Sequence, residues 1–424
     1  MRTFKIIGLF YVLYSLYTLF IVSVSDYKML YATAGLMCMW MVFFSLLAGY
    51  KSIKGTEALY NKQYFDKDIS FPFANMMLWE PLHYLTAMLC SWTFSILAAK
   101  FYTGRGFGAV VQGIFGGVNA YNDYQNYFNN KLSQISVIER MPYVFMFTVV
   151  TILMIWSAIS ILAYRNSISI GEALYLGSVI ASYMYFGVAR GTNFETYLVF
   201  VLIVYCLLQK FEGQINSDNL KYIGIVILGA ILLVAVFRGR IADRGVVFTN
   251  NICPEIQFDS KSYIVRMFPV LSSISVSLFG YLGYGIFAIG VTISDICLSD
   301  IGAALNSLIP FGFELNRGIS IGDLLRSTID VGVKWVPDFV LALNIFGFIL
   351  LILVSFAIGR LIKAIDNMRA SQFLKDIIGV IVYLEMLSFP VGNFIISSTP
   401  NKLIVVFILF WVVQYKVFKV KVRI

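Results

Sequence analysis

Arginine is the residue type whose placement in this chain most suggests chemistry. Arg190 lies in a tight turn between two apolar stretches, and Arg238, Arg240 and Arg244 follow directly on the end of another. A guanidinium presents a planar fork of donors that grips phosphate oxygens bidentately and keeps its charge when partly desolvated. These four arginines therefore predict a site that binds an anionic ligand such as a phosphate. The competing interpretation is that they snorkel from helix ends to lipid headgroups.

A carboxylate follows Arg190 at close sequence distance. Glu195 falls in the first turn of the apolar stretch that begins after the segment 189–193. In one interpretation it pairs with Arg190 and favours the positive end of its own helix. In the other it is a general base that orients an acceptor beside the bound phosphate. Because ionisable residues at membrane depth are functional candidates by default, Glu195 is the candidate catalytic base.

Aromatic and amide side chains alternate in a second region. Tyr121, Tyr124 and Tyr127 recur at helical spacing, with Asn122 among them. Aromatic rings stack on the C–H faces of sugars and amides meet hydroxyls, so these four residues are candidate sugar-binding groups. An aromatic belt at the membrane interface is an equally good interpretation.

Two further residues invite a catalytic interpretation that their depth argues against. Glu80 and His83, the only histidine, are three residues apart beside Pro81. If the span begins near Phe73, both lie about 10–15 Å in from the cytoplasmic side at 1.5 Å per residue, on the wrong half for an outer site. We therefore expect a structural role. No acidic cluster resembles a magnesium site, and neither a metal nor another cofactor is expected.

The elements that must position these residues are membrane helices. Of the 424 residues, 59% are hydrophobic and 13% charged, whereas soluble domains carry about 25% charged residues. Several runs reach the roughly 20 apolar residues that cross a bilayer. The composition predicts an all-α polytopic integral membrane protein, with residues 1–424 forming a single membrane domain of about 10–12 helices. The expected spans are 5–24, 29–49, 73–99, 142–164, 168–188, 192–209, 221–237, 339–359, 376–396 and 403–417.

The distribution of basic residues predicts the orientation of these spans. Seventeen basic residues, of which twelve are lysine, are expected on one side, and fifteen, of which nine are arginine, on the other. The lysine-rich side reads as cytoplasmic, which places both termini there. Two sizeable periplasmic loops, 100–141 and 238–338, follow from this orientation. The net charge of +9 comes without basic stripes interleaved with aromatics, so no nucleic-acid partner is expected.

The segment 268–293 leaves two topologies open. It is long and uncharged, and a single crossing there would put the basic C-terminus outside. Either it re-enters and leaves on the same face, or it pairs with 297–312 as a helical hairpin, so that 268–312 forms two extra spans. Further on, the helical spacing of Ile321, Leu325 and Ile329 predicts a helix lying in the membrane interface. Pairing of Cys253 with Cys297 is a further open question, because spacing alone does not decide it.

Three short motifs carry a resemblance to a known family. They are Gly-Gly-Val-Asn-Ala-Tyr at 116–121, Arg-Gly at 190–191, and Tyr-Leu-Gly-Tyr-Gly at 281–285 ahead of a long polar loop. Together with the polytopic layout, which covers most of the chain, they resemble the Wzy-type O-antigen (oligosaccharide repeat-unit) polymerases of Gram-negative bacteria.

The resemblance implies a GT-C-like glycosyltransferase of the bacterial inner membrane that serves lipopolysaccharide biosynthesis. Such an enzyme acts on the periplasmic face and transfers a glycan from undecaprenyl diphosphate to the terminal sugar of another lipid-linked repeat unit. It would be metal-independent and inverting. Its expected partners are the undecaprenyl-diphosphate-linked oligosaccharide, membrane lipids and a chain-length regulator protein.

Two other classes of protein remain as alternatives. An O-antigen ligase would share the architecture and the arginines but would transfer to the lipid A core. A polysaccharide flippase or other transporter would not be an enzyme. It would more often show short loops on both faces, inverted repeats and charges at mid-bilayer positions.

Overall fold

The computed structural model describes residues 2–53, 81–115, 120–163, 168–210, 256–329, 336–366, 372–392, 395, 398 and 401–406. In these ranges the regular secondary structure is helical, apart from one isolated bridge between Ser25 and Phe258. The chain divides into two compact units. Unit 1 holds 1–63, 247–370 and 381–397, and unit 2 holds 64–246, 371–380 and 398–424.

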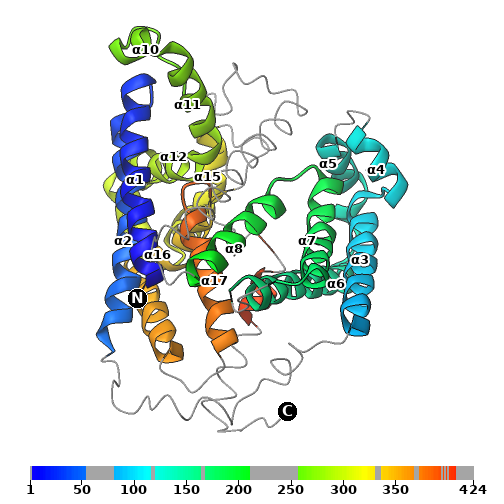
Figure 1. Ribbon diagram of the computed structural model, residues 1–424. Helices are drawn as coiled ribbons and strands as arrows, with labels where there is room; N and C mark the ends of the chain where they lie inside the picture. The colour runs from blue at the N-terminus through cyan, green and yellow to red at the C-terminus, as the bar shows by residue number, and fades with distance from the viewer. Residues whose placement is uncertain are drawn as a thin grey trace. The chain divides into compact units, whose positions relative to one another are not determined.

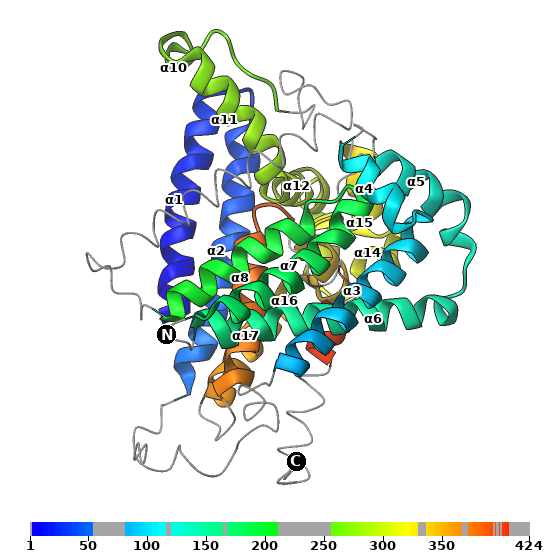
Figure 2. The same cartoon turned by 45° about the vertical axis from the view of Figure 1, so that its right-hand side comes forward.

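Unit 2 is built on three long helices, α3 (Pro81–Thr103), α6 (Val137–Ala158) and α7 (Ile170–Arg190), which pack against one another (Figure 1). The starts of α6 and α7 are fixed by capping boxes, in which Ser136 pairs with Glu139 and Ser169 with Glu172. A π-helical turn, η4 (Ile159–Ala163), extends α6, and α8 (Phe194–Lys210) follows α7 after a short turn. Two short helices, α4 (Phe107–Phe115) and α5 (Ala120–Asn130), lie at the end of α7 that carries Arg190 (Figure 2).

Unit 1 is organised around α1 (Arg2–Val24), α2 (Met29–Ser52) and α16 (Asp338–Asp366). Glycines let α2 and α16 approach closely: a Cβ on Gly49 would lie within contact distance of the Phe356 carbonyl oxygen, and one on Gly359 against that of Leu46. Because lipid gives helices little hydrophobic reason to associate, such small-residue contacts are how membrane helices gain packing. α16 is interrupted at Gly347, whose φ of 65° and ψ of 171° are not helical.

The segment from 256 to 297 starts and ends at the same end of α1 and α2. Asp26 N–H donates to the Gln257 carbonyl at 3.0 Å, beside the α1–α2 turn. The chain then forms α10 (Tyr263–Met267) and α11 (Pro269–Leu282), and α11 runs beside α1 (Figures 1 and 2). It continues into α12 (Tyr284–Val291) and the π-helical turn η6 (Thr292–Cys297), where Tyr31 donates to Asp295 at 2.7 Å.

Three short helices follow, α13 (Ile301–Leu308), α14 (Gly312–Arg317) and α15 (Ile321–Thr328). The expected helix near 321–329 is present, but its apolar side does not face outward. Ile321, Leu325 and Ile329 are buried, and α15 packs on α16. Its exposed side carries Asp323 and Arg326, joined by an ion pair of 2.9 Å.

Within the residues that the structure describes, five helices are long and apolar enough to cross a membrane, Phe4–Val24, Met29–Ser52, His83–Thr103, Val137–Ala163 and Asp338–Asp366. A sixth candidate is the pair Pro269–Gly280 and Tyr284–Cys297, bent by 66°. The all-α, multi-pass membrane character is therefore confirmed. The predicted spans at 168–188, 192–209 and 376–396 correspond to α7, α8 and α17 (Gln372–Ser388), while 221–237 and most of 403–417 lie outside the described residues.

Candidate functional site

The end of α7 presents Arg190 on a fixed turn. Gly191 adopts the left-handed conformation at φ 66°, which glycine reaches without a Cβ penalty. Its N–H donates to the Val188 carbonyl, and the Thr192 N–H donates to the Gly187 carbonyl at 2.9 Å. This is the Schellman arrangement that closes a helix C-terminus. Arg190 is the last residue of that helix, where a cation also complements the helix dipole.

The Arg190 guanidinium lies between two aromatic rings and is largely removed from water. Its Cζ is 4.7 Å from the ring centroid of Phe186 and 5.3 Å from that of Tyr124, and its side chain is 15% exposed. Cation–π contacts strengthen when the cation is desolvated, so both rings favour the charged form at this position. The Nε–H of Arg190 is buried and has no hydrogen-bond partner among the described residues. A buried donor on a charged group is costly to leave without a hydrogen bond. The Nε–H can therefore donate to an acceptor atom of a bound ligand.

Glu195 is the internal counter-ion of Arg190. Its Oε1 lies 3.6 Å from Nη2 of Arg190, and its Oε2 accepts a 2.8 Å hydrogen bond from the Thr192 hydroxyl. The residue is 1% exposed. The expected pairing of Glu195 with Arg190 is thus present, and in this geometry both carboxylate oxygens meet groups of the chain itself.

A glycine on α7 makes room for this carboxylate. A Cβ on Gly187 would lie 2.6 Å from Oε2 and 2.9 Å from Cβ of Glu195. Any side chain at position 187 would displace Glu195 from Thr192 and Arg190. The two α7 residues that shape the site, Phe186 and Gly187, precede Arg190 by four and three positions and so share its helix face.

α5 brings part of the predicted sugar-binding set to the same turn. A Cβ on Gly191 would lie 2.6 Å from the Tyr121 backbone nitrogen, so the two backbones touch, and the Tyr121 side chain is buried. Tyr124 covers the guanidinium, and Asn122 is exposed. Tyr127 lies farther along α5, against Gly104. Within the set, Tyr121 is buried, Tyr124 and Tyr127 are half-buried, and Asn122 is exposed.

Tyr102, on α3, completes the surroundings of Arg190. Its ring meets the Phe186 ring edge-on with centroids 5.7 Å apart, and its phenol lies within electrostatic range of both Arg190 and Arg140. The sequence analysis did not identify Tyr102 and Phe186 as site residues. Phe186 was open to inference from its helical spacing to Arg190, whereas Tyr102 reaches the site only through the packing of α3 on α7.

Three other arginines that the sequence places on the outer side, and that the structure describes, are bound by nearby groups of the chain. Arg140 donates to the Ile135 and Ser133 carbonyls, and Arg105 donates to the Ala109 carbonyl. Arg317 pairs with Asp300 at 3.1 Å. Arg190 is likewise paired, with Glu195, but its side chain, at 15% exposed, is more buried than that of Arg317, at 35%.

Several predicted residues fall outside the described ranges. They include Arg238, Arg240 and Arg244 of the expected diphosphate site, Glu80, and Cys253. His83 is exposed on α3, and Cys297 is a buried free thiol. Within the described ranges no group of three or more His, Cys, Asp or Glu residues is placed to hold a metal ion. Comparisons of the chain with protein-family models, curated proteins and solved structures found no match.

Proposed function

We propose that this chain is an O-antigen or polysaccharide repeat-unit polymerase of the bacterial inner membrane. It would transfer a glycan from undecaprenyl diphosphate to the terminal sugar of a second lipid-linked repeat unit on the periplasmic face. The observation that carries this proposal is Arg190, a guanidinium held between two aromatic rings at a helix end with a buried, unmatched Nε–H. Such a preorganised cation suits the charge that develops on a leaving diphosphate, without a divalent ion.

In the proposed reaction the acceptor hydroxyl oxygen attacks the anomeric carbon of the donor glycan. A new C–O bond forms with inversion while the bond from that carbon to the diphosphate oxygen breaks. The lipid diphosphate leaves with the bonding electrons, and its charge is stabilised by Arg190. Arg238, Arg240 and Arg244 are proposed to complete the anion site, and the hydroxyl proton passes to Glu195.

The Arg190–Glu195 pair has a defined role in this proposed reaction. Glu195 is 1% exposed and is bound by Thr192 and Arg190. In this state it does not contact the acceptor sugar, and it would do so only after the substrate binds. A diphosphate that takes over Arg190 as its counter-ion would release Oε1 of Glu195 to act as a base. Tyr124, which already covers the guanidinium, and the exposed Asn122 would then face the first sugar.

A strain that lacks the chain tests the proposal. The expected phenotype is lipopolysaccharide that carries a single repeat unit. Loss of all antigen from the core would instead indicate a ligase, and lipid-linked intermediates trapped on the cytoplasmic side would indicate a flippase.

Complementation then tests the site. Arg190→Gln is expected to fail to restore long chains, and Arg190→Lys to restore them poorly, because a lysine is a point charge without the planar fork. Arg326→Gln is the matched control, since Arg326 is an exposed arginine already paired with Asp323. Long chains from the Arg190→Gln strain would refute the assignment of this site.

A further inference from the structure

The segment 269–317 of unit 1 combines features that point to an unusual relation to the bilayer. α11 and α12 are bent by 66° at their junction, α13 and α14 have 8 and 6 residues, and none reaches the roughly 20 residues of a span. Their positions along α1, α2 and α16 show how deep each part reaches.

The first part descends along α1 and returns along α2. Tyr17 donates to the Ser275 carbonyl at 2.9 Å, and the Tyr14 ring stacks on Phe279. Tyr14 is ten residues before the end of α1, or about 15 Å at 1.5 Å per residue, which is half of a roughly 30 Å hydrocarbon core. Asp295 then meets Tyr31, the third residue of α2. Both ends of 269–297 therefore lie at the α1–α2 turn, with the deepest point near Phe279.

The second part repeats this path. α13 begins at Asp300, and its last residues reach the break in α16, where a Cβ on Gly347 would lie 2.6 Å from the Ile309 carbonyl oxygen. The eight residues of α13 span about 12 Å. α14 then turns back, so that Arg317 pairs with Asp300 at 3.1 Å. The ion pair closes the two ends of a hairpin whose tip is at Ile309–Gly312.

The depth of this tip follows independently from α16. Ser45 of α2 donates to the Ile352 carbonyl, so the two residues are at the same level. Ser45 is sixteen residues into α2, and Gly347 is five residues before Ile352. Gly347 therefore lies about 16 Å from the start of α2. The two estimates agree, and both place the tip of the hairpin near the middle of a bilayer.

α14 buries Gly312 and Phe313 and exposes Glu314, Asn316 and Arg317. α13 shows the reverse of a water-soluble surface, because Ala303 and Ser307 are buried while large apolar side chains of the helix and of the residues around it face outward. These exposed residues are Leu298, Ile301, Leu305, Leu308, Ile309, Phe311, Leu315 and Ile319.

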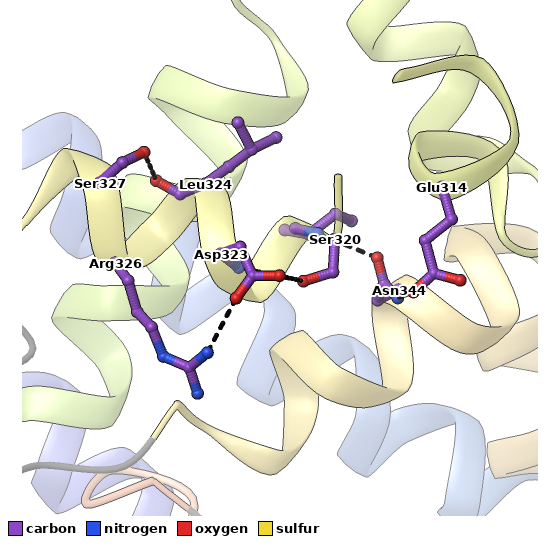
Figure 3. Close-up of polar contacts among 8 residues, drawn as sticks. Glu314, Ser320, Asp323, Leu324, Arg326, Ser327 and Asn344 are labelled. Carbon is purple, nitrogen blue, oxygen red and sulfur yellow. Dashed lines mark hydrogen bonds and ion pairs between the residues drawn. The ribbon is translucent and has the colours of Figure 1, made fainter. Parts of the chain in front are cut away.

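The neighbouring α15 shows the opposite pattern within the same module. It buries Ile321 and Leu325 and exposes Asp323 and Arg326. Figure 3 shows the ion pair between the last two. Asn344 of α16 joins the two, since it donates to Glu314 and accepts from the Ile321 N–H. A boundary between solvents therefore runs between α13 and the polar side of α15.

We propose that 269–297 and 300–317 are two re-entrant hairpins that enter and leave on the face of the α1–α2 turn. The outward side of α13 contacts the acyl chains of the leaflet on that face. Bilayer lipid is the occupant that fits, because α16 exposes large apolar residues in the same way along its span, among them Ile349 and Leu353. The charged ends, Asp300 and Arg317, lie at the depth of the headgroups.

Spin-label depth measurements on the full chain in nanodiscs test this inference. Nitroxides are attached to single cysteines at Ile301, Leu305, Ile309 and Leu315, with Cys90 and Cys253 replaced by serine. Collision with oxygen relative to a water-soluble nickel chelate is expected to rise from Ile301→Cys through Leu305→Cys to Ile309→Cys and to fall again at Leu315→Cys. All four sites are exposed, so the labels replace no core contact.

Two controls calibrate the measurement. Leu353→Cys on the span α16 should report lipid, and Ser327→Cys on the polar side of α15 should report water. A Leu305 label as open to the nickel chelate as the Ser327 label would overturn the lipid contact. A depth that keeps changing in one direction from Ile301 to Leu315 would mean that the segment crosses the bilayer, and would overturn the re-entrant path.

Discussion

Removal of both partners of the Arg190–Glu195 pair should cost less than the sum of the two single removals. Arg190→Met keeps an unbranched stem between Phe186 and Tyr124 but leaves the Glu195 carboxylate, 1% exposed, with Thr192 and no counter-ion. Loss of one member of a buried pair costs about 3–5 kcal/mol. Glu195→Gln keeps an acceptor for Thr192 and leaves a guanidinium whose side chain is 15% exposed, so its cost should be lower, about 1–3 kcal/mol.

The double variant then measures the coupling between the two groups. With both charges gone, the loss in free energy of unfolding should be smaller than the sum of the two single losses by about 1–3 kcal/mol. Unfolding in mixed micelles, titrated with SDS and followed by tryptophan fluorescence, provides the four values. Arg140→Met is the matched control, because its guanidinium is bound by the Ile135 and Ser133 carbonyls and should not couple to Glu195→Gln. Losses that add within about 0.5 kcal/mol would refute the pairing.

Four further predictions follow from the same structure. Gly49→Ala should lower the melting temperature, because its Cβ would collide with a carbonyl of α16, whereas Gly177→Ala, which meets nothing within 4 Å, should leave it unchanged or raise it. Gly191→Ala forces φ 66° on a residue with a Cβ and pushes on Tyr121, so it should cost about 1–3 kcal/mol in the same unfolding assay. Tyr124→Leu should weaken retention of a lipid diphosphate in a vesicle-binding assay while Tyr124→Phe preserves it, since the ring rather than the hydroxyl covers Arg190. The Ala303 N–H donates to Asp300 and, together with Arg317, lowers the pKa of this carboxyl. The stabilisation from the ionised carboxylate is complete above the unfolded pKa near 3.9 and is lost as pH falls through the lower folded pKa. Hydrogen exchange of α13 should therefore accelerate only below about pH 4.

The positions of the membrane helices were readable from the sequence because length and apolarity are local properties. The expected span 29–49 is α2, Met29–Ser52, and 168–188 is α7, Ile170–Arg190. The span predicted to begin at 142 corresponds to α6, which begins five residues earlier, at Val137. Its capping box, Ser136 with Glu139, sets the start at Val137, and Pro142 is tolerated near the N-terminus, where few backbone donors are used.

The path of 269–297 could not be predicted from the sequence, because an apolar run of this length is compatible with both a membrane span and a re-entrant loop. Contacts of Tyr17 and Tyr31 with residues more than 250 positions away place Ser275 beside α1 and Asp295 beside α2, and the re-entrant path is proposed from them. The same limit applies to the site. Arg190 and Glu195 are five residues apart across one turn, so their pairing was predictable. The approach of Tyr102 depends on the register of α3 against α7, which no local pattern encodes.

Synthesis from a defined donor tests the central proposal most directly. The purified chain in nanodiscs is incubated with undecaprenyl-diphosphate-linked repeat unit in the absence of divalent metal, and the products are resolved by length. The expected result is a ladder of lipid-linked oligomers with wild type, none with Arg190→Gln and an unchanged ladder with Arg326→Gln. Oligomers of equal length from Arg190→Gln, or no oligomer from wild type unless lipid A core is supplied, would contradict it.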